Sequence, residues 1–204
     1  MRFYSVWVAG AIIAIFIVFQ GLLGWDLAWN VGSFEVQFFT SMLAHGSTAH
    51  LLGNLFGILL FGLLLEAVIG SKRFVHILIV SAIVGNLAGI GSYERVLGIS
   101  GGVYGLIGAL SVLRPTLVIW LSGLPVPMIL VGIGYALYDI IGLSAGVTQT
   151  GHLAHLGGLV VGVFFGLRHR KDVLIPPKKR VKKSVNDPSL DRALDSYEQR
   201  FMRR

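Results

Sequence analysis

A serine between glycines is the first feature of this sequence that could perform chemistry. Ser100 stands in the stretch Gly98-Ile99-Ser100-Gly101-Gly102-Val103-Tyr104-Gly105, at the start of an apolar run that ends at Leu113. A hydroxyl in hydrocarbon is costly unless it is paired, and glycines allow a second segment or a substrate to come close. Taken alone, such a serine is more typical of helix packing. Whether it is a nucleophile therefore depends on which residues can reach it.

A histidine in the last apolar run is the candidate base. An ionisable residue inside such a run is a functional hypothesis by default, because its burial is expensive. His155 precedes three glycines spaced by four, which form one smooth helix face that a neighbouring helix can approach: Gly158, Gly162 and Gly166. If that neighbour is the segment that begins at Ser100, His155 can reach the hydroxyl and act as its general base. His152, nearer the start of the run, is predicted to be interfacial.

Two further polar residues could stabilise an oxyanion. His50 and Asn54 are four residues apart and share one helix face. Both can donate hydrogen bonds and neither carries a negative charge, which suits an oxyanion better than a metal ion. His45 falls off that face, and we predict a structural hydrogen bond for it. A His-Glu-x-x-His zinc motif is absent, although the histidines together could still form a metal site.

Three other polar side chains lie in apolar runs. Tyr104 follows Ser100 by one turn, so it could stack on the imidazole of His155; plain core packing is the alternative. Glu66 is predicted to make a structural bond to a neighbouring span or loop. Asp139 is predicted to be interfacial.

The glycines around the serine have separate predicted duties. Gly98 and Gly101 would open the backbone for a scissile carbonyl, because they carry no side chain. Gly105 and Gly108 would let the helix that carries His155 approach.

These residues need membrane helices to bring them together. The chain of 204 residues is 54% hydrophobic and 13% charged, with a mean hydropathy of +0.76, whereas soluble domains are about a quarter charged. Residues 24–44, rich in Trp and Phe, predict an interfacial loop. Apolar runs of roughly the length of a span predict six transmembrane helices: Val6–Leu23, Ser47–Ile69, Phe74–Gly91, Ser100–Leu113, Ile119–Leu143 and Gly151–Leu167.

Basic residues orient the predicted spans. With the N-terminus in the cytoplasm, Arg2, Lys72-Arg73, Arg114 and the C-terminal tail all lie inside, as the positive-inside rule requires. The second, fourth and sixth spans then begin at the outer side. The candidate site residues are therefore expected to meet at one depth, near the outer surface.

The net charge of +7 belongs to the C-terminal tail. Twelve of the 17 Lys and Arg residues lie in residues 168–204 with five acidic residues, whereas residues 1–167 hold five of each. A basic tail beside a membrane indicates anionic lipid headgroups as its partner and not nucleic acid. We predict a six-helix domain in residues 1–168 and a flexible basic cytoplasmic tail in residues 169–204, with a short amphipathic helix near residues 188–202.

Several other classes of function are disfavoured. The absence of cysteine excludes disulfides, thiol chemistry and cysteine zinc sites. Gly-x-Ser-x-Gly also describes the elbow of soluble hydrolases, but that motif needs a preceding strand, and nothing here alternates as sheet strands do. A small transporter would want charges at mid-span or broken helices in symmetric halves, and no internal repeat is visible.

Three motifs together resemble those of the rhomboid intramembrane serine proteases: His45-x4-His50-x3-Asn54, then Gly98-x-Ser100-Gly101, then Ala154-His155-x2-Gly158. The resemblance covers essentially residues 1–168. It implies an all-α membrane protein, a six-transmembrane-helix rhomboid bundle with an interfacial loop between helices 1 and 2. One departure is visible: many members carry Trp-Arg before a Phe-Thr where this chain reads Val36-Gln37-Phe38-Phe39-Thr40.

The resemblance implies a serine endopeptidase that cleaves transmembrane proteins in or near their membrane segments through an acyl-enzyme, without metal or cofactor. Its Ser-His dyad, which includes no aspartate, falls on Ser100 and His155, with oxyanion help from His50, Asn54 and the Ser100 N–H. A prokaryotic cell membrane is the expected location, with both termini in the cytoplasm and the site open to the outer side. The alternative is a catalytically inactive relative that binds membrane clients; such relatives usually lack the serine or the histidine.

Overall fold

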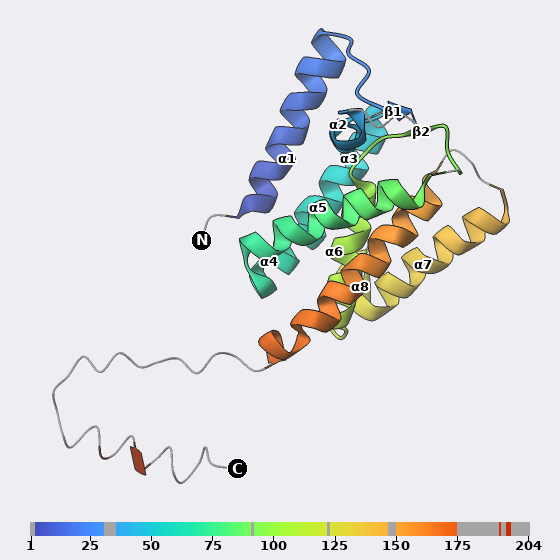
Figure 1. The fold of residues 1–204 in the computed structure, drawn as a ribbon. Coiled ribbons are helices and arrows are strands. Elements are labelled where there is room, and N and C mark those ends of the chain that lie inside the picture. The colour runs from blue at the N-terminus through green and yellow to red at the C-terminus, as the bar shows by residue number, and fades with distance from the viewer. Residues whose placement is uncertain are drawn as a thin grey trace.

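The computed structural model describes residues 3–30, 36–90, 92–121, 123–146 and 150–174, together with residues 192, 195 and 196. These residues form a mostly helical membrane protein (Figure 1). Nearly all of the predicted C-terminal tail, including the expected amphipathic helix, lies outside the described residues. Among the described residues, the α-helices longer than one turn are α1 (Tyr4–Ile15), α3 (Thr48–Gly57), α4 (Leu63–Ile69), α5 (Ser71–Ala88), α6 (Ser100–Leu113), α7 (Met128–Ser144) and α8 (His152–Leu174).

Several helical segments have the length and composition of membrane spans. The first joins α1 to the π-helical stretch η1 (Phe16–Leu22), and the second joins α3 to α4 through the π-helical stretch η3 (Ile58–Gly62). Among the described residues, three segments are long and apolar enough to cross a bilayer: Tyr4–Leu22, Thr48–Ile69 and Ser71–Ala88. Their outer faces carry large apolar side chains such as Trp7 and Phe56, as contact with lipid tails requires. Helices α6 and α7 are apolar but shorter.

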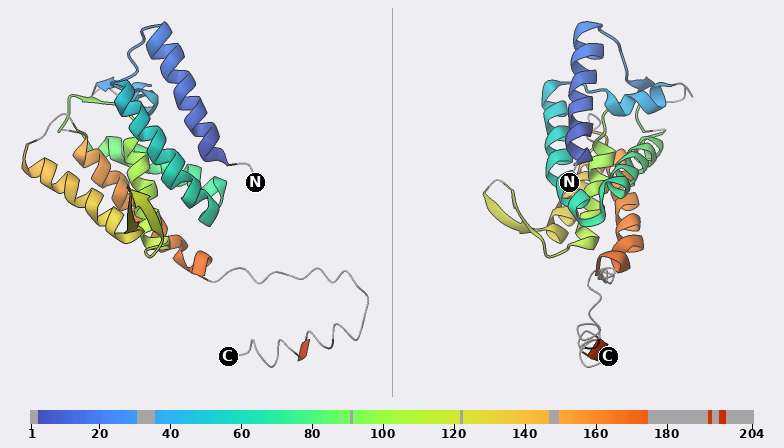
Figure 2. Two further views of the ribbon diagram at one scale, coloured as in Figure 1. Left: turned by 180° about the vertical axis from the view of Figure 1, so that it is seen from behind. Right: turned by 90° about the vertical axis from the view of Figure 1, so that its left-hand side faces the viewer.

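Helix α6 lies at the centre of the molecule. All of its residues except Ser100 and Val112 are buried, and it packs against α5, α7 and α8. Helices α7 and α8 run side by side, whereas α1 stands at the edge of the bundle (Figures 1 and 2). A helix that is apolar on every side is suited to such a central position, so three neighbouring helices fix the position of the helix that begins at Ser100.

Glycines allow the backbones of α6 and α8 to come into direct contact. A Cβ atom on Gly158 would overlap the backbone of Gly101, and one on Gly162 would overlap the backbone of Gly105. Gly166 continues the same face, where a Cβ would lie 3.0 Å from the Ala109 carbonyl oxygen. The predicted glycine face of α8 is therefore confirmed, and it meets the helix that begins at Ser100, as small residues do in membrane helix pairs.

Glu66 anchors the first helix to the second helical segment. Its carboxylate accepts hydrogen bonds from the backbone N–H groups of Tyr4 (2.6 Å) and Ser5 (2.9 Å), and from the Ser5 hydroxyl (2.8 Å). The first N–H groups of a helix have no partner in their own helix, and a carboxylate also favours the positive end of the helix dipole. The structural role predicted for Glu66 is confirmed.

Short elements cover the end of the bundle at which α3, α6 and α8 begin. Strand β1 (Trp29–Asn30) pairs antiparallel with β2 (Arg95–Val96), and α2 (Gln37–Thr40) continues into the 3-10 turn η2 (Ser41–Leu43). The N–H of Gly98 donates to the carbonyl of Ser41 at 2.8 Å. The segment predicted as an interfacial loop thus holds the backbone that leads into Ser100.

The prediction that the fifth span begins at Ile119 is wrong. Residues there form the antiparallel hairpin β3 (Val118–Leu121) and β4 (Leu124–Pro127), which projects from the helices (Figure 2), and α7 begins only at Met128. Gly123 has a φ of +82° in the turn, and prolines, which lack an N–H, disfavour a helix interior. Hydropathy alone does not distinguish an apolar hairpin from the start of a span. Two other predicted ends also differ, since α5 begins at Ser71 and α8 continues to Leu174.

Candidate active site

Ser100 and His155 meet through the contact between α6 and α8. The Ser100 hydroxyl donates to Nε2 of His155 at 2.9 Å. Ser100 is the first residue of α6 and His155 lies in the first turn of α8, so both side chains lie near the same end of the bundle. The predicted contact between these two residues is present in the structure, with the distance of an ordinary hydrogen bond.

Tyr104 holds the imidazole of His155 from one side. The two rings are stacked, with centroids 4.2 Å apart and an interplanar angle of 11°. Tyr104 is itself buried and contacts the ring of Tyr135 edge-on at 5.2 Å. The predicted stacking is confirmed, and it restricts rotation of the ring that faces Ser100.

Asp139 contacts Nδ1 of His155, the ring nitrogen opposite the one that faces Ser100. The sequence did not predict this contact. Oδ1 of Asp139 accepts from Nδ1–H of His155 at 3.0 Å, and the carboxylate is completely buried. A carboxylate accepts only, so the bond requires the proton on Nδ1 and leaves Nε2 free to accept from Ser100. The sequence prediction of an interfacial position did not anticipate that α7 packs this face against α8, which buries Asp139 within the protein. A lone acidic residue in an apolar run was the available signal.

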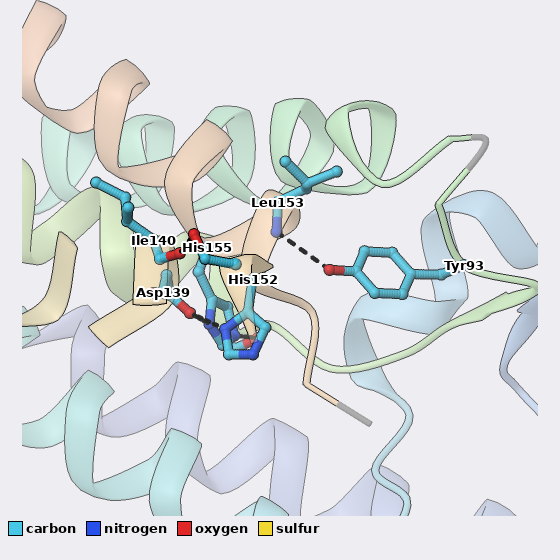
Figure 3. Close-up of polar contacts among 8 residues, drawn as sticks. Tyr93, Asp139, Ile140, His152, Leu153 and His155 are labelled. Carbon is cyan, nitrogen blue, oxygen red and sulfur yellow. Dashed lines mark hydrogen bonds and ion pairs between the residues drawn. The ribbon is translucent and has the colours of Figure 1, made fainter. Parts of the chain in front are cut away.

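His152 is also buried within the protein, which the sequence did not predict. Its Nδ1 lies 2.6 Å from the same Oδ1 of Asp139 (Figure 3). The ligand atoms of Asp139, His152 and His155 lie within 4.8 Å of one another, a grouping that could hold a metal ion. The distances from Oδ1 to the two Nδ1 atoms are, however, those of hydrogen bonds, so the described arrangement is a hydrogen-bonded cluster.

The first turn of α8 is held by Tyr93, which precedes β2. Its hydroxyl accepts from the backbone N–H of Leu153 at 3.2 Å (Figure 3). The first N–H groups of a helix need such partners. Sequence spacing gave no signal for this contact, because the two residues are far apart in the chain.

The two side chains predicted to stabilise an oxyanion, His50 and Asn54, both lie on α3. Asn54 is buried, and its Nδ2 has no hydrogen-bond partner among the described residues. Gly98 has a φ of +95°, and a Cβ atom there would lie 2.8 Å from Nε2 of His50 and 3.4 Å from Nδ2 of Asn54. Ser47 caps this helix by accepting from the N–H of His50 at 3.1 Å. Only glycine therefore fits between these two donors and the chain that leads to Ser100.

Gly101, Gly105 and Gly108 lie in packing contacts. A Cβ atom on Gly105 would overlap the side chain of Ser81 and lie 3.3 Å from the carbonyl oxygen of Gly158. A Cβ atom on Gly101 would lie 3.1 Å from the carbonyl oxygen of Ala154 and 3.4 Å from that of Ser81. Gly101 also lines the cavity beside Ser100. The backbones of α5 and α8 occupy the space that a side chain at Gly101 would need. Gly108 likewise faces α8, where a Cβ would lie 3.0 Å from the backbone nitrogen of Val163.

His45 has a structural environment, as predicted. Its Nδ1–H donates to the carbonyl of Leu43 at 3.1 Å, and its backbone exchanges two hydrogen bonds with the amide of Gln20, at 2.8 and 3.0 Å. Burial, with a smaller effect of His50, lowers the pKa of His45 to about 4. The ring is therefore neutral at physiological pH, and it contacts the ring of His50 edge-on at 5.2 Å.

The candidate site residues line one cavity. It has a volume of about 780 Å³ and is lined by Ser100, His155, Tyr104, His50 and Asn54, among others. Residues of the connecting segments also line it, including those around positions 93–98 and 150–151. The Ser100 hydroxyl, the His155 imidazole and the unpaired Asn54 amide thus line a common space, which is what acyl transfer to a serine would require.

Comparisons with known proteins found a family model and a relative that match this chain. A family model described as the rhomboid domain matches residues 29–171. The Rhomboid protease GlpG of Haemophilus influenzae is 34% identical over 134 residues, which represent 64% of this chain and 67% of that protein.

Proposed function

The chain belongs to the rhomboid family, and from this premise we propose that it is an intramembrane serine endopeptidase. Its substrates are membrane proteins, which it cuts in or near their transmembrane segments. The observation that carries the proposal is the 2.9 Å hydrogen bond between Ser100 and His155. A relative named a rhomboid protease supports the same activity.

Acylation begins with Ser100. Its Oγ attacks the scissile carbonyl carbon while Nε2 of His155 takes the hydroxyl proton. The carbonyl π electrons move to oxygen, and a tetrahedral intermediate forms. His155 then gives its proton to the leaving amine, so that an acyl-enzyme remains and one peptide product is released.

The oxyanion is held by donors at the edge of the cavity. Nδ2 of Asn54, the imidazole of His50 and the N–H of Ser100 are the proposed donors. The Ser100 N–H stands at the start of α6, where the helix dipole also favours negative charge. A buried donor without a partner, as Asn54 offers, suits a charge that appears only during the reaction.

Water completes the cycle, activated by the same imidazole. The cavity of about 780 Å³ offers a route for this water from the end of the bundle where the connecting segments lie. A substrate helix must unwind locally, because a helical carbonyl is hydrogen-bonded and shielded. Substrates with small or helix-breaking residues near the outer surface are therefore expected.

We further propose a six-span topology with both termini in the cytoplasm. The six spans lie in residues 1–168. The basic residues 169–204 form a tail that binds anionic lipid headgroups. The site then opens towards the outer side of what we take to be a prokaryotic cell membrane.

The test uses purified protein in detergent and a model single-span substrate. The unmodified chain should cleave, and Ser100→Ala and His155→Ala should each lose activity by at least about 10³-fold, because the nucleophile or its base is gone. Ser144→Ala is the matched control, since Ser144 is exposed on α7 and bonds only its own helix at Ile140 in the described contacts.

A fluorophosphonate probe should label the unmodified chain and not Ser100→Ala. Equal cleavage by the unmodified chain and Ser100→Ala would show that Ser100 is not the nucleophile. An unmodified chain that binds membrane clients but neither cleaves nor reacts with the probe would instead be an inactive relative.

A further inference from the structure

Asp139 is a buried carboxylate at the centre of a hydrogen-bonded cluster. Its exposed fraction is 0%, and Oδ1 accepts from Nδ1 of both His155 (3.0 Å) and His152 (2.6 Å). A buried carboxylate is costly unless it is hydrogen-bonded and its charge is compensated. The arrangement also joins α7 to the two histidines of α8, and one of these faces Ser100.

We infer that Asp139 is a positioning residue for the Ser100–His155 pair, and that His152 holds the carboxylate in place. This inference rests on the proposed function, and it replaces the expected two-residue dyad with a chain of three groups. Oδ1 of Asp139 keeps the proton of the neutral imidazole on Nδ1, so Nε2 stays free to act as base.

The carboxylate also acts during the reaction. When the Ser100 proton moves to Nε2, His155 becomes a cation with N–H groups at both nitrogens. Asp139 stays ionised and stabilises that cation through the hydrogen bond to Nδ1; no proton passes to the carboxylate. When His155 passes the Nε2 proton to the leaving amine, the neutral Nδ1–H imidazole is restored.

The ring of His152 packs against Gly142 of α7, in a space that a larger residue at that position would fill. A Cβ atom on Gly142 would overlap the His152 ring, approaching Nδ1 to 2.9 Å. Gly142 is three residues after Asp139, so the two share one helix face. Tyr138 contacts the same ring at a centroid distance of 5.8 Å. The imidazole is thus confined by shape on one side and by the carboxylate on the other.

The first test replaces the carboxylate by an amide of the same shape. Asp139→Asn should lower kcat by about 10²–10⁴-fold, as loss of the corresponding charge does in soluble serine proteases. KM should change little, because Asp139 does not line the cavity that would hold the substrate. A folded Asp139→Asn variant whose kcat stays within about threefold of the unmodified chain would overturn the inference.

A second readout separates positioning from stability. In ¹⁵N-histidine NMR spectra of the unmodified chain, His155 should carry its proton on Nδ1. The Asn amide can donate, so Asp139→Asn should shift His155 towards the Nε2–H form. An unmodified chain with the proton on Nε2 would contradict the inference. This measurement needs no proteolysis, so it still tests Asp139 if the unmodified chain fails to cleave and the proposed function fails.

A pair of glycine variants covers the case in which Asp139→Asn does not fold. Gly142→Ala pushes His152 away from Asp139 and should lower kcat by about 10- to 100-fold, as small displacements of catalytic geometry do. Gly134→Ala is the matched control on the same helix, because a Cβ there meets nothing within 4 Å. Equal activity of the two variants would show that the packing of His152 against Gly142 has no influence on catalysis, and would overturn the role inferred for His152.

A metal ion is the competing explanation for the grouping of Asp139, His152 and His155. Activity in excess EDTA should equal that without it, since the inferred cluster works through hydrogen bonds alone. Loss of activity in EDTA that zinc restores would overturn the inference in favour of a metal site.

Discussion

Two asparagines show how differently buried amides can be used at the scale of the residue. Asn86 donates from Nδ2 to the carbonyl of Phe38 at 3.2 Å and to the hydroxyl of Ser41 at 3.3 Å. Asn54 is equally buried and both asparagines line the cavity, yet Nδ2 of Asn54 has no partner among the described residues. An unsatisfied buried donor costs stability, so its retention beside Ser100 suits a group that works only when an oxyanion forms.

Substituting these two residues should therefore give opposite results. Asn54→Ala should lower kcat by about 10²–10³-fold, the usual cost of one oxyanion donor, with little loss of stability. Asn86→Ala should lower the free energy of unfolding by about 1–3 kcal/mol, because the Phe38 carbonyl and the Ser41 hydroxyl each lose a hydrogen bond. Steady-state cleavage and thermal unfolding in detergent measure both. Full activity in Asn54→Ala would remove Asn54 from the proposed oxyanion site.

At the scale of the element, the pairing of α6 with α8 determines whether the site exists. Ser100 and His155 each stand near the start of their helix, so a small separation or rotation of the two helices moves the hydroxyl away from Nε2. Glycines set this separation, since Gly158 and Gly162 lie directly on the backbone of α6. The same reasoning applies to α7, whose Asp139 and Gly142 meet α8 from another side.

Gly162→Ala should disturb this pairing, because its Cβ would overlap the backbone of Gly105. We expect a loss of about 1–3 kcal/mol in the free energy of unfolding, the usual cost of overpacking, together with reduced cleavage. Gly10→Ala on α1 is the matched control: its Cβ meets nothing within 4 Å, and alanine favours the helix by about 1 kcal/mol. Unfolding of both variants in detergent provides the comparison. Equal stability of the two would mean that α6 and α8 tolerate separation.

At the scale of the whole molecule, the proposed topology places the site at the outer surface. Helices α3, α6 and α8 begin at one end of the bundle, where β1, β2 and α2 also lie. Hairpin β3–β4 follows α6 at that helix's other end. The natural absence of cysteine makes this arrangement directly testable with single-cysteine variants.

Ser92→Cys and Thr116→Cys should report opposite sides of the membrane. Both positions are exposed, one between α5 and β2 and the other between α6 and β3. A membrane-impermeant maleimide should label Ser92→Cys in intact cells and Thr116→Cys only after lysis, because basic residues retain the second segment inside. Labelling in the reverse pattern would invert the proposed orientation and the side from which water reaches Ser100.

Much of this protein could be predicted from local sequence. Composition indicates a membrane protein, and the spacing of residues such as His50 and Asn54, or Gly158 and Gly162, shows which side chains share a helix face, because the helix repeat is constant. The contact of Ser100 with His155 and the stacking of Tyr104 were also predicted. The glycine face of α8 left open which helix approaches it, and the resemblance to the rhomboid motifs pointed to the helix that begins at Ser100.

Only the tertiary structure decided the surroundings of the imidazole. Local spacing cannot tell which face of α7 meets α8, so it did not predict that Asp139 and His152 are buried together. Hydropathy likewise could not separate hairpin β3–β4 from a span, because burial of apolar residues does not depend on backbone form. The sequence by itself determined the family and the Ser-His pair, whereas the carboxylate behind His155 depends on a contact between helices that no local pattern encodes.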